Sequence, residues 1–165
     1  MILLVRVDER LIHGQVVVGW HGVLNATVFV VVDDGIVSTD WERELVVAGV
    51  PEGTRGEVHP VSEAVRAWEG WRSDAERRIV LFQDFHPVAA LVDAGVTLPE
   101  VNVGGLHQRR GRREFLSYVY LDEEEVAVCV RLCAAGVRLE ARNVPSAGGV
   151  DLCRRLPARE RKSSC

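Results

Sequence analysis

Short apolar runs alternate with segments of helical pattern along most of the chain, and this rhythm constrains the fold more than any other feature. The runs are rich in Val, Ile and Leu, as is typical of strands that are covered on both faces. They predict strands over residues 2–7, 28–32, 57–61, 79–82, 101–103, 118–121 and 138–142. Strands that alternate with helices form right-handed βαβ units, so we expect an α/β fold with a mainly parallel twisted sheet of about seven strands.

Helix signals lie between these runs, over about 16–24, 39–48, 62–71, 87–94 and 123–135. Ser62 is expected to cap the third of these helices, and Pro87 suits the first turn of the fourth. Asp122 is expected to cap the last helix, and Gly136 to end it in a left-handed conformation. Residues 106–117 lack a helical pattern and predict a hairpin or an extended loop.

Length and composition limit the possible classes of protein. A chain of 165 residues with 47% hydrophobic residues suits one domain, which we place at 1–156, followed by a charged, disordered tail at 157–165. A net charge of −4 argues against a globally basic nucleic-acid binder. No apolar stretch approaches the roughly 20 residues of a membrane helix, and no signal peptide is visible. We therefore expect a cytoplasmic protein.

The cysteines do not suggest a metal site. None of the four forms a C-x-x-C pair. Cys129 and Cys133 share one helix face, but no further ligand lies near them in sequence, so buried thiols are the expected state. Cys165, near the end of the polar tail, is expected to be exposed. Four tryptophans on expected helices are assigned to the core: Trp20, Trp41, Trp68 and Trp71.

The most informative segment is residues 6–16, Arg-Val-Asp-Glu-Arg-Leu-Ile-His-Gly-Gln-Val. It follows the first expected strand, and open α/β sheets bind their ligands at the carboxyl ends of their strands. Arg6 and Arg10 can supply guanidinium groups that match phosphate oxygens. His13 between such cations is suited to hold a phosphoryl group.

Three further residues of this segment fit the same interpretation. Asp8 could hold Arg10 or an imidazole N–H, and Gly14 could bring backbone N–H groups close to an anion at a helix start. Gln15 adds a polar side chain. The alternative is an ordinary Asp–Arg surface pair beside a packed histidine.

This segment resembles the phosphorylation loop of the IIB components of the mannose/fructose/sorbose family of the bacterial phosphoenolpyruvate-dependent sugar phosphotransferase system. Residues 101–105, Val-Asn-Val-Gly-Gly, resemble the second signature loop of that family. Residues 119–124 and 136–145 resemble its later strand–helix–strand unit. The resemblance therefore extends over nearly the whole chain.

The resemblance implies an open sheet with helices on both faces and a phosphoryl relay. A phosphohistidine on a IIA domain would donate to His13, which would pass the group to a sugar held by the membrane subunits IIC and IID. Arg10 and Asp8 would assist, and Arg6 and Gln15 would shape the loop. No metal, nucleotide or other cofactor is implied. The alternative is a regulatory module that accepts phosphate or binds a partner without serving sugar transport.

Other residues carry weaker signals. Gly104, Gly105 and His107 form a possible second loop beside the first. A basic loop is expected to dock an acidic protein partner, with a solvated loop as the alternative and nucleic-acid binding disfavoured because aromatic residues do not interleave. It comprises Arg109, Arg110, Arg112 and Arg113. Asp84, in a loop that differs from the family pattern, would repel a phosphoryl group if it lay close. A homodimer and association with the membrane complex are both compatible with the sequence.

Overall fold

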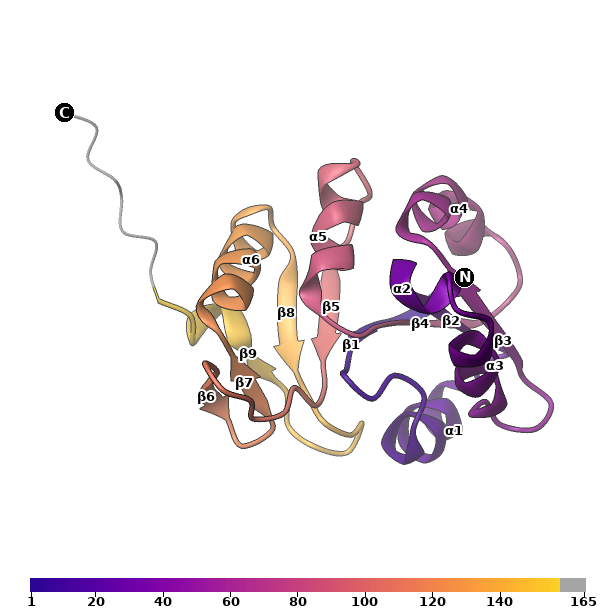
Figure 1. The fold of residues 1–165 in the computed structure, drawn as a ribbon, viewed down its shortest axis with the longest axis horizontal. Helices are drawn as coiled ribbons and strands as arrows, with labels where there is room; N and C mark the ends of the chain where they lie inside the picture. Colours follow the sequence, from indigo (N-terminus) through magenta and orange to yellow (C-terminus); the bar gives the residue numbers. More distant parts are fainter. Residues whose placement is uncertain (158–165) are drawn as a thin grey trace.

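The computed structural model describes residues 1–157 and has a seven-stranded sheet at its centre (Figure 1). The strands lie in the order β3 (Arg55–His59), β2 (Val28–Val32), β4 (Arg78–Phe82), β1 (Ile2–Val7), β5 (Glu100–Val103), β8 (Arg138–Ala141) and β9 (Val150–Asp151). All neighbouring pairs are parallel except β8 and β9. The expected mainly parallel sheet of about seven strands is confirmed.

One expected strand does not belong to this sheet. Residues 118–121 contribute β7 (Val119–Leu121), which pairs antiparallel with β6 (Arg113–Leu116) in a separate hairpin. The segment expected to be a hairpin or an extended loop, 106–117, supplies a loop at 107–112 and only the first strand of this hairpin, and β9 takes the seventh place in the sheet. Val119 and Leu121 are fully buried. The apolar run therefore predicted a buried strand correctly, but it did not predict which strand pairs with it.

Helices cover both faces of the sheet. One face packs against α4 (Val61–Ser73), α5 (Phe85–Asp93) and α6 (Glu123–Ala134), which stand together on the upper side in Figure 1. The other face packs against α3 (Asp40–Ala48) and a π-helix, η1 (Gln15–His21), that continues as α1 (Gly22–Leu24). Two short helices, α2 (Asp34–Val37) and η2 (Leu152–Arg154), complete the fold. No helix among the described residues has the length and apolar character needed to cross a membrane.

Local signals set several helix ends. Asp122 and Glu125 form a reciprocal capping box at the start of α6, and Gly136 follows its end with φ +90°. Pro87 lies in the first turn of α5, as expected. The expected cap at Ser62 is wrong: α4 begins one residue earlier, with Pro60 at the N-cap position and no side-chain hydrogen bond there.

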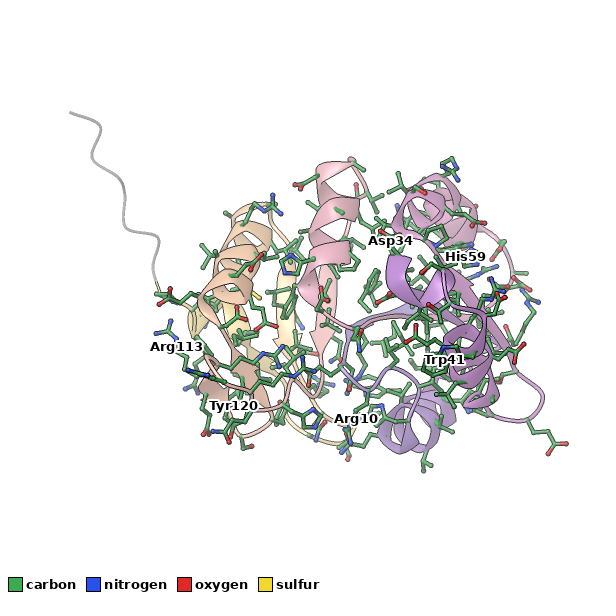
Figure 2. All side chains as sticks on the ribbon, viewed as in Figure 1. Arg10, Asp34, Trp41, His59, Arg113 and Tyr120 are labelled. Atoms are coloured by element: carbon green, nitrogen blue, oxygen red, sulfur yellow. A yellow bond between two sulfur atoms is a disulfide. The ribbon has the colours of Figure 1, made fainter. Side chains whose placement is uncertain are left out.

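The tryptophans divide between core and surface. Trp20, Trp68 and Trp71 are buried, as expected. Trp41 is 65% exposed on α3, so its assignment to the core is wrong (Figure 2). A tryptophan in an amphipathic helix therefore does not by itself indicate the buried face.

The cysteine interpretation is partly wrong. Cys129 is a buried thiol, and burial raises its pKa above the ordinary value. Cys133, however, forms a disulfide with Cys153, across 5.9 Å between the Cα atoms. The pair joins the end of α6 to η2, a contact that spacing along the sequence does not reveal. Cys165 and the predicted tail, apart from Pro157, lie outside the described residues.

Candidate active site

The 6–16 segment lies at the carboxyl end of β1, between the ends of its two neighbouring strands. The backbone N–H of Asp8 donates to the carbonyl of Phe82, the last residue of β4, at 2.9 Å. On the other side, the N–H of Gly104 donates to the carbonyl of Val7, at 2.8 Å. The segment therefore occupies the central position of the carboxyl edge, as the sequence analysis predicts.

A buried ion pair forms the base of the site. Arg6 Nη2 donates to Asp8 Oδ2 at 2.7 Å, and neither side chain is exposed. Arg6 also donates to the side chain of Asn102 and to the carbonyls of Arg142 (2.9 Å) and Asn143 (3.2 Å). Burial lowers the pKa of Arg6 even though Asp8 acts to raise it. The guanidinium is therefore committed to holding Asp8, Asn102 of β5 and the loop that follows β8, rather than to a ligand.

The second loop, at residues 104–105, closes over this pair. A Cβ on Gly104 would overlap both the Arg6 guanidinium and the Asp8 carboxylate, so only glycine fits there. The N–H of Gly105 donates to Asp8 Oδ2 at 3.1 Å. The structure thus brings together the two loops that the sequence analysis singled out separately.

His13 lies above Asp8 with its side chain 14% exposed. Its Nδ1 is 3.0 Å from the carbonyl oxygen of Leu11, and its Nε2 is 3.8 Å from Asp8 Oδ2. Among the described residues, Nε2 is buried without a hydrogen-bond partner. Because a carbonyl can only accept, the first contact requires a proton on Nδ1. Since Nε2 faces the buried carboxylate, attack through Nδ1 requires the ring to release the Leu11 carbonyl.

Arg10 faces solvent beside the histidine loop. Its side chain is 44% exposed, its Nη2 donates to Gln15 Oε1 at 2.9 Å, and its Nε is 3.9 Å from Asp8 Oδ1. Its backbone N–H also donates to Asp8 Oδ1, at 3.2 Å. Asp8 therefore orients the backbone of Arg10, while Gln15 holds a guanidinium that can turn toward a ligand.

The unusual backbone conformation of the loop lies at Leu11 and not at Gly14. Gly14 has helical dihedrals, φ −50° and ψ −42°, and a Cβ there would meet nothing within 4 Å. Leu11 instead adopts the left-handed conformation, with φ +49° and a buried side chain. The N–H groups of Val16 and Val17 donate to the His13 carbonyl, so they fix the start of η1. The positive φ at Leu11 had no signal in the sequence.

The basic loop is only partly a surface. Arg112 is 7% exposed and paired with Glu9 and Glu125, so its assignment to a docking surface is wrong. Arg109 is 63% exposed and contacts Glu9 at 2.7 Å. Arg110 is exposed, and the exposed Arg113 lies over the ring of Phe115, 5.0 Å from its centroid. In Figure 2, Arg10 lies on the same lower edge of the molecule as Tyr120 of the hairpin.

His107 and the acidic residues take supporting positions. His107 Nδ1 lies 2.9 Å from Glu9 Oε2, so this histidine is tied to Glu9. Asp84 caps α5 by accepting the N–H of His86 at 2.7 Å, and Asp33 caps α2. Glu9, which pairs with Arg112, and Asn102, which binds Arg6, were not predicted as site residues from the sequence. No group of three His, Cys, Asp or Glu residues within residues 1–157 could hold a metal ion.

Comparison with known proteins places this chain and its fold in one family. The model of the family described as phosphotransferase system sorbose subfamily IIB component matches residues 2–164. The fructose-specific EIIB component of Bacillus subtilis is 31% identical over 150 residues, covering 91% of this chain and 92% of the relative. The mannose-specific EIIAB component of Escherichia coli is 33% identical over 141 residues, 86% of this chain and 44% of that longer protein.

Solved structures of IIB components have the same fold as this chain. The crystal structure of the IIB domain of the sorbose permease from Klebsiella pneumoniae matches with a TM-score of 0.85 and 30% identity, covering 94% of this chain and 95% of that one. The N-acetylgalactosamine-specific IIB component 1 of E. coli matches with a TM-score of 0.81 and 28% identity, covering 90% and 97%.

The chain belongs to the sorbose-subfamily IIB components of the phosphotransferase system. It is a phosphotransferase of a sugar-uptake system, which receives a phosphoryl group from a IIA component and transfers it to the sugar. Its partners are a IIA component and the membrane IIC and IID components. The relatives support this transport function and not the regulatory alternative.

Proposed function

We propose that His13 is the residue that carries the phosphoryl group between the IIA donor and the sugar. The observation that supports this most strongly is that His13 and Arg10 both lie within 4 Å of one carboxylate, Asp8, at the carboxyl end of β1. In that place an imidazole can attack, a carboxylate can hold the imidazole, and a guanidinium can meet the phosphoryl oxygens.

The contacts of His13 suggest how the ring becomes a nucleophile. If the ring releases the Leu11 carbonyl, the proton can reside on Nε2, which faces the buried Asp8 carboxylate at 3.8 Å. The lone pair of Nδ1 then attacks phosphorus while the bond from phosphorus to the donor imidazole breaks and returns its electron pair to the donor nitrogen. Asp8 also compensates the positive charge that a phosphorylated, Nε2-protonated imidazole carries.

Arg10 is proposed to hold the equatorial phosphoryl oxygens during both transfers. Its guanidinium is exposed and held at one end by Gln15, so it can turn to the phosphoryl group without breaking a buried contact. Phosphoryl transfer depends mainly on positioning and charge stabilisation. Gly14, with open space at its Cα, leaves room for a donor to approach His13.

The surface around the site is proposed to dock the partners. Arg109, Arg110 and Arg113 form its basic part. Exposed apolar side chains beside Gly14 and Gln15 provide a second part and would also be the surface of a homodimer; they are Val18 and Val23. We place the protein in the cytoplasm, as one IIB-like domain over residues 1–156 that associates with the membrane complex holding the sugar.

The proposal is tested by following phosphate through the relay. The protein is incubated with phosphoenolpyruvate, the general phosphotransferase proteins and a cognate IIA component, then mixed with vesicles that contain IIC and IID and with candidate sugars. Wild type and His86→Ala, a variant of an exposed histidine, are expected to acquire an acid-labile phosphate and pass it to one sugar. His13→Ala is expected to do neither, and undiminished labelling of that variant contradicts the proposal.

A further inference from the structure

Glu9 lies between Asp8 and Arg10 in sequence, and its side chain points away from them into a buried ionic cluster. The cluster consists of Glu9, Arg112 and Glu125, each with a side chain 7% exposed. Arg112 Nη1 donates to Glu9 Oε1 at 2.7 Å. Its Nε donates to Glu125 Oε2 at 2.9 Å, and its Nη2 donates to the other oxygen of Glu125. One guanidinium therefore joins two buried carboxylates from distant parts of the chain.

Both ends of this cluster are fixed to the backbone. Glu125 is part of the capping box of α6, where its carboxylate accepts the N–H of Asp122 at 2.9 Å. Glu9 accepts the N–H of His107 at 2.9 Å, and its own N–H donates to the carbonyl of Gly105 at 3.0 Å. The cluster thus connects the start of a packed helix to the loop that carries Asp8, Arg10 and His13.

The charges of the cluster are mutually stabilised. Burial raises the pKa of Glu9, but hydrogen bonds from His107 and Arg112 outweigh it and hold that pKa below the ordinary value. Removing Arg112 would leave Glu9 with His107 and with Arg109, which is 63% exposed and therefore free to move. A buried carboxylate that loses its guanidinium is left as an uncompensated charge, which destabilises the position that it holds.

We propose that Glu9 and Arg112 act as a pair of positioning residues for phosphoryl transfer, because they hold the backbone of the histidine loop against the second loop. Asp8 accepts the N–H of Gly105 and also orients the N–H of Arg10. A shift of Glu9 therefore moves both Asp8 and Arg10 relative to His13. This role rests on the proposed function of His13, and it is distinct from docking, since Arg112 is not on the surface.

The test compares single-turnover transfer from phosphorylated IIA to wild type, Arg112→Gln, Glu9→Gln and the double variant. Arg131→Gln, which removes an exposed ion pair on α6, is the matched control. Arg112→Gln is expected to lower the rate at saturating donor by about tenfold or more, while the half-saturating donor concentration stays within about twofold. The rate of the double variant is expected to lie within about twofold of the rate of the slower single variant. The effects of two residues in direct contact do not add, because either substitution already breaks the pair.

Backbone hydrogen exchange supplies a readout that does not depend on transfer. The N–H groups of Glu9 and Gly105 are expected to exchange faster in Arg112→Gln than in wild type, with the circular dichroism unchanged. If Arg112→Gln does not fold, Arg112→Lys decides the question, since one ammonium keeps the charge but cannot span both carboxylates. It is expected to show a smaller loss of rate and faster exchange at the same two positions.

Three results would overturn the proposal: an unchanged rate at saturating donor, an effect confined to the half-saturating concentration, or a slower transfer with unchanged exchange. Failure of the proposed function would be visible separately, as undiminished labelling of His13→Ala. The exchange experiment would still test the connection between the two loops in that case.

Discussion

At the scale of single residues, the site separates a buried charge from an exposed one. Arg6 and Asp8 are both fully buried and hold each other, whereas Arg10 is 44% exposed and contacts Asp8 only at 3.9 Å. Of the two arginines that the sequence analysis offered as phosphate ligands, only Arg10 is therefore free to meet a phosphoryl group. Arg6 lies within the first predicted strand and Arg10 lies three residues beyond its end, but the residue type alone does not show which guanidinium is buried.

Arg10→Lys tests whether the shape of the guanidinium matters in addition to its charge. Lysine keeps the charge but cannot meet two phosphoryl oxygens with a planar fork. We expect a loss of about 1.5–3 kcal/mol, the range for a hydrogen bond to a charged group, or roughly ten- to a hundredfold in single-turnover rate. Circular dichroism serves as the control for folding. A loss below about twofold would transfer the role to a different group.

Gly104→Ala tests the close packing of the two loops. The added Cβ would overlap the buried Arg6–Asp8 pair, so we expect the free energy of unfolding to fall by about 2–4 kcal/mol. Gly70→Ala, in the middle of α4 with open space around it, is the matched control and is expected to gain up to about 1 kcal/mol. Both values come from chemical denaturation, and equal effects of the two substitutions would contradict this account.

At the scale of elements, the hairpin β6–β7 and the loop before it divide the basic residues between two tasks. Arg112 points inward to Glu9 and Glu125, while Arg110 and Arg113 remain exposed. A run of basic residues in a sequence is usually interpreted as part of the protein surface. One member of this run, Arg112, is instead buried in ion pairs with Glu9 and Glu125. These ion pairs of Arg112 become visible only in the fold, which brings residues 9, 112 and 125 together.

Reversing the two exposed charges, as Arg110→Glu with Arg113→Glu, tests docking by this hairpin. We expect a higher half-saturating concentration of phosphorylated IIA and little change in the rate at saturation. The effect should shrink as salt rises, because screening acts over about 8–10 Å at physiological ionic strength. Transfer kinetics at low and high salt measure this, and salt-independent kinetics identical to wild type would assign docking to another surface.

The ionic cluster also predicts a dependence of stability on pH. The pKa of Glu9 is lowered in the folded protein, so its carboxylate contributes stability that is complete above the ordinary value of 4.5 and is lost as the pH falls through the folded pKa. The difference in unfolding free energy between wild type and Glu9→Gln should therefore be larger at pH 7 than at pH 3. Denaturation at both pH values measures it, and a difference that is independent of pH would refute the prediction.

At the scale of the whole molecule, apolar periodicity was sufficient to predict the parallel sheet, because buried strands must be continuously apolar. It could not assign residues 118–121 to the hairpin, since a short apolar run does not reveal which strand it pairs with. The loop motif led to Asp8, Arg10 and His13, but the role of Glu9 in the same motif depends on Arg112 and His107, which only the fold brings beside it. The Cys133–Cys153 pair and the left-handed Leu11 depend on contacts that only the folded chain establishes.

The central claim is that His13 carries the phosphoryl group, and peptide mapping of the phosphorylated protein tests it most directly. Wild type is phosphorylated through its IIA donor, digested at alkaline pH, where phosphohistidine survives, and sequenced by mass spectrometry. The account predicts one phosphoryl group per chain, on the imidazole of His13. A phosphoryl group on His107, or on any other side chain, with His13 unmodified would contradict it.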